Sequence, residues 1–300
     1  MYRRARGCRV RANASLFRWK LQATLRCSVE SCASLRCPGR LGRETFGVTA
    51  LMVEPGERVD PSPLTAFEFG YVCGDGGEQR VPLVEVGPVA FEAAVPARRF
   101  RPRKGQRHLS GLWWSATTGA HVGYESWLER DHLLALDFDP RVVGIASQPF
   151  WLHWVDADGQ RVSHVPDYFA RRGDGSAVVV DCRPVERRKK PRDVAKFDAT
   201  AGACRMLGWE YRLVGAVDPV ETANLRWLAG YRHPRYRVLE TEVALVAVFA
   251  TAMPLMDGAE LVGDPVAVLP VLFHLLWCHD LVADLRVPLS DATLVSGSAG

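Results

Sequence analysis

The pattern of apolar and polar positions predicts an ordered series of helices and strands through the middle of the chain. Between residues 122 and 136, apolar side chains recur at three- and four-residue spacing with charges between them, which is typical of an amphipathic helix. On such a helix Glu125, Glu129 and His132 share one face. The run DFDP ends this helix, because the residue before Pro140 is pushed out of the α region.

Short extended runs follow this first helix. Alternating or continuously apolar segments bounded by turn residues indicate strands. In chain order they predict one or two strands within residues 142–155, a tight turn at 156–159, a strand over 161–170, a hairpin connection at 171–176 and a central strand over 177–182.

A charged linker then leads into a second helix, which ends at Gly208. A strand over residues 209–217 precedes a third helix, with Asp218 as its N-cap and Pro219 in its first position. The succession of helix, hairpin strands, helix, strand and helix predicts a mixed sheet flanked by helices. We therefore expect an α/β domain over residues 105–235.

The flanking segments have a different character. Residues 52–104 are rich in Gly, Pro and short β-prone runs, which predicts an irregular β-containing lead-in that ends in a basic arm. Residues 236–300 predict a C-terminal module of two or three helices and a short β-hairpin, similar to a small winged-helix unit. The apolar run at residues 266–278 is shorter than the roughly 18 residues of a membrane span. It predicts a core helix instead.

The net charge of +4 is unevenly distributed. Residues 1–51 contain eleven Arg and Lys against two Glu, a net charge of 11 − 2 = +9, so the remaining residues sum to 4 − 9 = −5. The basic pI is therefore no sign that the folded part binds nucleic acid. We expect residues 1–51 to be a poorly ordered extension, with an organellar transit peptide as the alternative. The four cysteines beyond it are scattered, which favours a reducing cytoplasm.

One stretch carries the candidate chemistry: HVPDYFARRGDGSAVVVDCRP, residues 164–184. Asp167 and Asp181 stand at the ends of neighbouring extended segments, so a hairpin can bring them close together. Two such carboxylates repel each other unless a cation lies between them, and a hard divalent ion such as Mg²⁺ is the simplest occupant. Acids beside a Gly-Asp-Gly hairpin are also common without any function, so both interpretations stay open at this point.

The residues around this stretch narrow the choice. ESWLERD on the first helix, then V-P-D, then VVVD-C-R-P fourteen residues later resemble the PD-(D/E)xK nuclease pattern. The segment from about Glu125 to Tyr231 resembles TnsA, the endonuclease subunit of heteromeric cut-and-paste transposases. This resemblance implies a restriction-endonuclease-like fold and a Mg²⁺- or Mn²⁺-dependent DNA endonuclease. It also implies nicking at the 5′ ends of a transposon.

The resemblance also assigns roles to residues. Glu129, Asp167 and Asp181 match the metal-binding and catalytic acids, with Glu125 as the fallback for the helix position. Arg183 matches the catalytic Lys but departs from it, because Arg cannot act as a base. The proton-accepting step then falls to hydroxide on the metal, to the substrate's own phosphate, or to one of three lysines: Lys189, Lys190 and Lys196.

The expected partners follow from the same resemblance. They are double-stranded DNA at transposon ends, an integrase-like transposase subunit and an ATP-dependent regulator that docks on the C-terminal module. DNA phosphates would contact Arg101, Arg103, Lys104, Arg107, Arg188, Lys189 and Lys190. We expect His164 to be a packed or capping residue rather than part of the site. The alternatives are a catalytically silent assembly subunit and a repair or restriction nuclease of the same fold.

Overall fold

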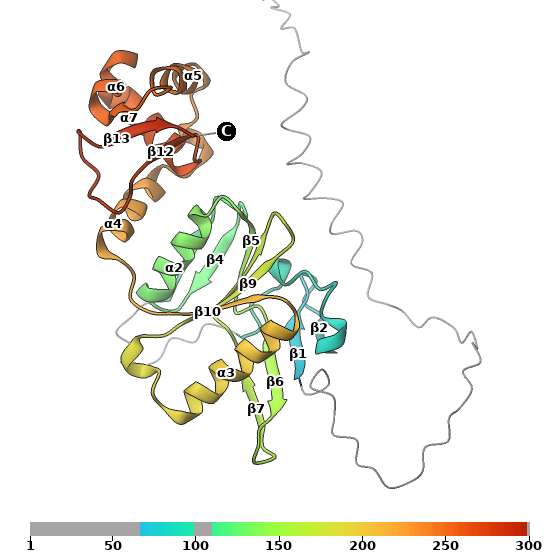
Figure 1. The fold of residues 1–300 in the computed structure, drawn as a ribbon. Coiled ribbons are helices and arrows are strands. Elements are labelled where there is room, and N and C mark those ends of the chain that lie inside the picture. The colour runs from blue at the N-terminus through green and yellow to red at the C-terminus, as the bar shows by residue number, and fades with distance from the viewer. Residues whose placement is uncertain (1–66, 99–109, 299–300) are drawn as a thin grey trace, which may run out of the picture. The chain divides into compact units, whose positions relative to one another are not determined.

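The computed structural model describes residues 67–98 and 110–298, all of which belong to the compact unit Val59–Gly300. The fold is mixed α/β, as the order of predicted elements indicated (Figure 1). The predicted extension at residues 1–51 lies outside the described residues. So do four residues of the predicted basic arm: Arg101, Arg103, Lys104 and Arg107.

A four-stranded sheet forms the centre of the fold. Its strands lie in the order β10 (Glu210–Val214), β9 (Ala177–Cys182), β8 (Tyr168–Arg172) and β5 (Val142–Ser147). The pairs β5–β8 and β8–β9 are antiparallel, whereas β9 and β10 are parallel, so the sheet is mixed. Strand β9 has a neighbour on each side and is buried over its first five residues. This confirms the predicted central strand.

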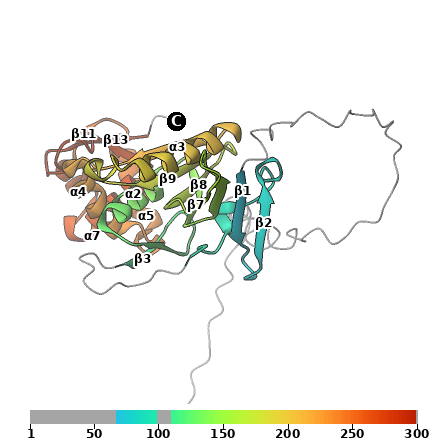
Figure 2. The same cartoon turned by 90° about the horizontal axis from the view of Figure 1, so that it is seen from below.

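Helices cover both faces of the central sheet (Figure 1). Helix α2 (Trp127–Phe138) packs Leu133 and Leu136 in one core with Val178 and Val180 of β9. Helix α3 (Pro191–Met206) packs Ala203 and Cys204 in another core with Val179. Figure 2 shows α3 along β8 and β9. Alternation along β9 therefore directs Asp181, two residues after Val179, to the α3 side.

A second, antiparallel sheet packs against the α3 side of the first. Its strands lie in the order β2 (Glu78–Pro82), β1 (Phe67–Val72), β6 (Trp151–Val155) and β7 (Arg161–His164). Two 3₁₀ turns, Leu83–Glu85 and Phe91–Ala93, follow β2. The core between the sheets is largely aromatic, and its rings lie 4.8–6.3 Å apart: Phe69, Phe91, Phe150, Phe169 and Trp209.

The prediction of one strand over residues 161–170 is wrong. The chain leaves the second sheet at the end of β7, His164, and enters the central sheet at Tyr168, the start of β8. Pro166 lies in the connection. Proline has no backbone N–H to donate, so it cannot continue a ladder through the interior of a sheet. The two sheets are thus joined by three residues, and Asp167 is the last of them.

The predicted start of the first helix is also wrong. Residues His121–Tyr124 form β4, which pairs with β3 (Gly111–Trp114) as a separate two-stranded sheet. Helix α2 begins only at Trp127, after Ser126 has taken the N-cap position. Glu125 therefore precedes the helix and does not share a helical face with Glu129.

Helix α4 (Pro219–Leu228) connects the central sheet to the C-terminal elements. The Asp218 side chain accepts hydrogen bonds from the backbone N–H groups of Val220 and Glu221, which confirms the predicted cap. Two 3₁₀ turns, Ala229–Tyr231 and Pro234–Tyr236, follow α4.

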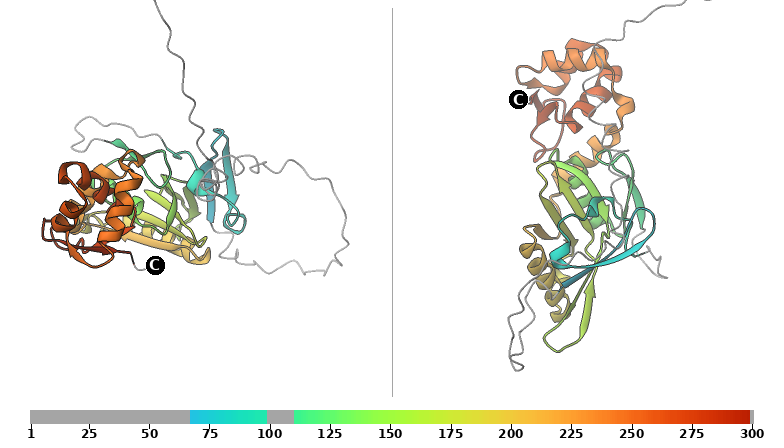
Figure 3. Two further views of the ribbon diagram at one scale, coloured as in Figure 1. Left: turned by 90° about the horizontal axis from the view of Figure 1, so that it is seen from above. Right: turned by 90° about the vertical axis from the view of Figure 1, so that its right-hand side faces the viewer.

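The C-terminal elements alternate between helix and strand. They are α5 (Leu239–Val248), β11 (Met253–Pro254), α6 (Leu255–Val262), α7 (Pro265–Trp277), β12 (Leu281–Ala283) and β13 (Leu294–Gly297), drawn in orange to red in Figure 3. The strands form one antiparallel sheet in the order β11-β13-β12. Three helices and a β12–β13 pair confirm the prediction, whereas β11 was not predicted.

Helix α7 is the core helix that the apolar run predicted, since its last seven residues are all buried. Within the part of the chain that the structure describes, no helix combines the length and apolar character required to cross a membrane.

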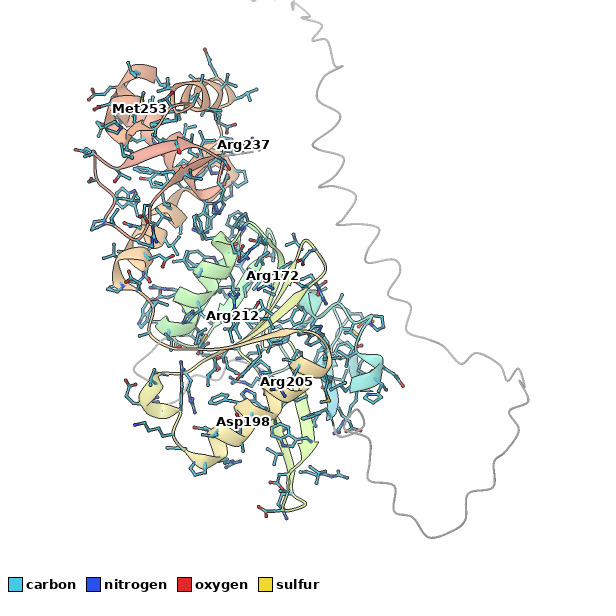
Figure 4. The ribbon with its side chains drawn as sticks, in the orientation of Figure 1. Arg172, Asp198, Arg205, Arg212, Arg237 and Met253 are labelled. Atoms are coloured by element: carbon cyan, nitrogen blue, oxygen red, sulfur yellow. The ribbon has the colours of Figure 1, made fainter. Side chains whose placement is uncertain are left out.

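Charged side chains cross one end of the central sheet. Arg172 of β8 and Arg212 of β10 both contact Glu210, and Figure 4 labels the two arginines. Surface ion pairs contribute about 0–1 kcal/mol each. We therefore assign these residues to the surface of the sheet and not to the candidate site.

Candidate functional site

A cleft of about 1570 Å³ opens beside the end of β9, between the α3 side of the central sheet and the start of α2. Both acidic and basic side chains line it, and it contains the predicted catalytic residues Glu129, Asp167, Asp181 and Arg183. Basic residues that follow β9 or lie on α3 also contribute to the lining: Arg187, Arg192 and Lys196.

Asp167 is fixed by three hydrogen bonds, two to β9 and one to the residue that follows β5. Its backbone N–H donates to the Val180 carbonyl (3.1 Å), and its carbonyl accepts from the Gln148 N–H (2.8 Å). Its carboxylate Oδ2 accepts from the Cys182 N–H at 2.7 Å. Burial raises the pKa of Asp167 well above its ordinary value, and the charges of Asp181 and Glu129 raise it further. The carboxylate therefore lies where its negative charge is disfavoured without a compensating cation.

Asp181 is the most buried acid of the site, with 3% of its surface exposed. Tyr211 on the parallel neighbour β10 donates its hydroxyl hydrogen bond to Asp181 Oδ2 (2.8 Å). His164 Nε2 lies 2.9 Å from Asp181 Oδ1 and 3.0 Å from Oδ2. Asp181 thus joins β9, β10 and β7 at one point.

His164 and Tyr211 are site residues that the sequence did not identify. We expected His164 to be a packed or capping residue, but its ring contacts the carboxylate of a predicted metal ligand. If residues 161–170 formed a single strand, alternation would place His164 and Asp167 on opposite faces of the sheet. The strand break at Pro166 removes that constraint, and no sequence signal showed that β7 would lie beside Asp181.

Glu129 is held at the start of α2 in a capping box. Ser126 Oγ accepts from the Glu129 N–H (3.2 Å) and donates to Glu129 Oε1 (2.9 Å), while Glu129 Oε2 accepts from the Glu125 N–H (2.6 Å). Burial raises the pKa of Glu129. The Glu129 carboxylate is close enough to Asp167 to raise its pKa, but it bonds to its own helix terminus.

Glu125, the fallback for the helix acid, forms an ion pair with Arg98 (Nη1 to Oε1, 3.1 Å). Arg98 is the first residue of the predicted basic arm over residues 98–107, and both Arg98 and Glu125 line the cleft. Glu125 is therefore neutralised by a cation of the chain itself, which makes Glu129 the stronger candidate for a metal ligand.

Arg183 pairs with a different acid, Asp193, and not with the three predicted metal ligands. Its Nη2 donates to Asp193 Oδ2 on α3 (3.0 Å), which lowers the pKa of Asp193. Its buried Nε has no hydrogen-bond partner among the described residues. Arg188 donates from Nε to the Arg183 carbonyl (2.9 Å), whereas Lys189 and Lys190 are exposed just before α3.

The structure thus gathers Glu129, Asp167 and Asp181, adds His164, and leaves Arg183 in the same cleft on a different partner. Over residues 67–98 and 110–298, no three His, Cys, Asp or Glu side chains are already placed so as to hold a metal ion together. The chemistry of the donor set nevertheless fits one, because carboxylates are ligands of Mg²⁺ and Mn²⁺ and an imidazole is a ligand of transition ions. Glu129 would have to leave its cap to join such a set.

Comparison of the sequence with protein-family models found no matching model. Comparison with curated protein sequences found no significant match.

Proposed function

We propose that this protein is a metal-dependent DNA endonuclease with a restriction-endonuclease-like fold. Within that class it would be the TnsA-like subunit of a heteromeric transposase, nicking the 5′ ends of the element. The observation that carries this proposal is the convergence of three carboxylates at one end of a mixed sheet. Burial raises the pKa of Asp167 there, and the nearby charges of Asp181 and Glu129 raise it further.

The order of elements supports the fold part of the proposal. In chain order, helix α2 is followed by β5, β8 and β9, then by helix α3 and the parallel strand β10, with β6 and β7 of the second sheet inserted between β5 and β8. The four strands β5, β8, β9 and β10 form one sheet. The acids come from the places where a nuclease of this type would carry them. Asp167 precedes β8, Asp181 is near the end of β9, and Glu129 is in the first turn of α2.

Two groups of side chains would have different roles in this function, metal binding and DNA binding. Asp167 and Asp181 would hold Mg²⁺ or Mn²⁺, with Glu129 joining them from α2. A metal bound there would polarise the phosphodiester and lower the pKa of the attacking water. Arg187, Arg192 and Lys196 line the same cleft, so they would offset the negative charge of the DNA backbone as it approaches the acids.

The C-terminal elements are proposed as the partner-docking module. The order helix, strand, helix, helix, strand, strand supports a winged-helix-like unit. Residues 238–298 contain eight Asp and Glu against one Arg, and this Arg286 is paired with Asp284. A surface with this charge repels DNA, so we assign the module to protein partners, the integrase-like subunit and the ATP-dependent regulator.

A second function, a catalytically silent assembly subunit, is favoured by one specific observation. Each of the three carboxylates already accepts hydrogen bonds from groups of the chain, and Arg183 is committed to Asp193. A protein that has lost its nuclease activity would retain the fold, while hydrogen bonds from groups of the chain would satisfy its carboxylates.

Metal binding separates the two functions. Titration calorimetry with Mn²⁺ and Mg²⁺ on the full chain should show binding in the wild type that is lost in the double variant Asp167→Ala/Asp181→Ala. The matched control is Asp156→Ala/Asp174→Ala, since these acids lie in exposed turns. The control should bind metal like the wild type. A folded wild type that binds neither ion, even with duplex DNA present, would leave the silent assembly subunit as the function.

With metal binding established, nicking of supercoiled DNA by the same proteins tests catalysis. We expect conversion to the open circle only with metal, and none with the Asp167→Ala/Asp181→Ala variant. Conversion by that variant at the wild-type rate would show that a contaminating nuclease, and not this site, cuts the DNA.

A further inference from the structure

The contact between His164 and Asp181 places a ring nitrogen beside both oxygens of a candidate metal ligand. The imidazole Nε2 lies 2.9 and 3.0 Å from the two carboxylate oxygens. Neighbouring ligand atoms on an octahedral ion with bonds of about 2.1 Å lie about 3.0 Å apart. The nitrogen and the oxygens therefore already have the separation of adjacent ligands on one ion.

The surroundings of His164 favour a functional role for the ring. His164 ends β7, directly before the connection that carries Asp167, and it lines the same cleft as Asp167, Asp181 and Glu129. Its side chain is 15% exposed, so it is accessible from the cleft without being free in solvent. The ring of Phe197 on α3 contacts it edge-on at 6.0 Å, which restricts its orientation.

We propose that His164 is a further ligand of the metal held by Asp167 and Asp181, and that it makes the site selective for Mn²⁺ or a similar transition ion over Mg²⁺. This inference rests on the proposed function. Imidazole suits transition ions, whereas Mg²⁺ is bound through carboxylates, phosphates and water. The nitrogen ligand therefore adds affinity for one class of ion and little for the other.

Tyr211 has a different part in the same centre. Its hydroxyl donates to Asp181 Oδ2, and the carboxylate has further lone pairs that remain for a metal. Tyr211 is thus a positioning residue that orients Asp181, as outer partners of metal ligands commonly do.

The hydrogen-bonding and metal-binding forms of a neutral imidazole differ only in which ring nitrogen carries the hydrogen. A neutral imidazole has one hydrogen, which resides on either Nδ1 or Nε2. With the hydrogen on Nε2, the ring donates to Asp181. With the hydrogen on Nδ1, the Nε2 lone pair faces the carboxylate oxygens, which is the arrangement that a shared ion requires.

Two measurements on the full chain test the inference. Titration calorimetry compares Mn²⁺ and Mg²⁺ affinities of the wild type, His164→Asn and the control His153→Asn. Asn lacks the ring nitrogen that contacts Asp181. His153 lies on β6 beside β7, opposite Ser163, and outside the cleft lining. Pulsed electron paramagnetic resonance of the Mn²⁺-loaded wild type then reports directly whether nitrogen is coupled to the metal.

We expect the wild type to bind Mn²⁺ at least about tenfold more tightly than Mg²⁺, with nitrogen coupling in the Mn²⁺ spectrum. His164→Asn should lose at least about tenfold in Mn²⁺ affinity and the nitrogen coupling, with Mg²⁺ binding little changed. His153→Asn should match the wild type.

The contrary outcomes separate the inference from the proposed function. Mn²⁺ binding that depends on Asp167 and Asp181 but shows no nitrogen coupling overturns the role of His164 alone. So does Mn²⁺ affinity that is unchanged in His164→Asn. A wild type that binds neither ion overturns both the role of His164 and the endonuclease.

Discussion

At the scale of single residues, Asp167 sets the properties of the site. Its carboxylate has one strong backbone donor, the Cys182 N–H, but it is desolvated and faces two other acids. Folding therefore favours the protonated form of Asp167 in the absence of a cation. The metal-free protein pays for this arrangement in stability, as functional sites commonly do.

This arrangement gives a pH-dependent prediction for Asp167→Asn. Because the pKa of Asp167 is raised on folding, the native state binds more protons than the unfolded state from about pH 4 upward, and stability falls as pH rises through that range. The neutral Asn avoids this loss and can still accept from the Cys182 N–H. We expect metal-free Asp167→Asn to be more stable than the wild type near neutral pH by about 0.5–2 kcal/mol.

Urea denaturation in the presence of a chelator, repeated at several pH values, measures this difference. It should shrink toward zero as pH falls to about 4, the range of an unperturbed Asp. Asp174→Asn is the control, because Asp174 is exposed and hydrogen bonding to Ser176 lowers its pKa. A stabilisation by Asp167→Asn that does not vary with pH would contradict the electrostatic explanation.

At the scale of elements, the first turn of α2 competes with the metal site for Glu129. Ser126→Ala removes one of the two groups that hold the Glu129 carboxylate and should cost about 1 kcal/mol as a lost N-cap. The freed carboxylate should then reach the acids more easily. We therefore expect Ser126→Ala to lower the free energy of unfolding and, at the same time, to strengthen Mn²⁺ binding.

The matched control is Asp218→Ala, which removes the N-cap of α4 outside the cleft. It should cause a similar loss in urea denaturation with no change in the calorimetric affinity for Mn²⁺. If Ser126→Ala weakened Mn²⁺ binding instead, the cap would be what holds Glu129 in its binding position.

The helices and strands also show which parts of the fold could be predicted from the sequence. The continuous apolar run AVVVDC predicted β9, and the Asp-Pro pair at residues 218–219 predicted the start of α4, because these signals are local. The boundary between β7 and β8 is decided by which sheet each half joins. That choice depends on aromatic packing around Phe69 and Phe150, residues far from Pro166 in the chain.

In the candidate site too, local sequence signals predicted some contacts, whereas others depend on tertiary packing. The hairpin pattern led us to expect that Asp167 and Asp181 lie close together, and the structure places them so. The contact of His164 with Asp181 depends on the packing of two sheets, and the direction of Arg183 depends on where α3 places Asp193. Neither interaction has a periodic signal in the sequence.

At the scale of the whole molecule, charge is separated along the chain. Basic residues cluster just before α3, beside the cleft, whereas residues 238–298 are strongly acidic. If the cleft receives DNA, the affinity for DNA and its dependence on salt should come from the basic residues beside the cleft. The acidic segment over residues 238–298 should contribute nothing to DNA affinity.

The double variant Lys189→Ala/Lys190→Ala tests this separation. It should weaken duplex binding and reduce the slope of log affinity against log salt by about 2, since each phosphate contact contributes about 0.9. Fluorescence anisotropy with a labelled duplex over a series of salt concentrations measures both quantities. Arg286→Glu changes the net charge by the same two units in the acidic module and should leave the slope unchanged. Equal effects of the two variants would indicate a response to net charge alone.

The three-residue connection between β7 and β8 also bears on how the protein unfolds. His164 belongs to one sheet, Asp181 to the other, and Asp167 to the connection itself. The sheets cannot separate locally without dismantling this cluster. The candidate site is therefore intact only while both sheets remain docked. Binding of a ligand to the site and docking of the two sheets are thus coupled in a single equilibrium.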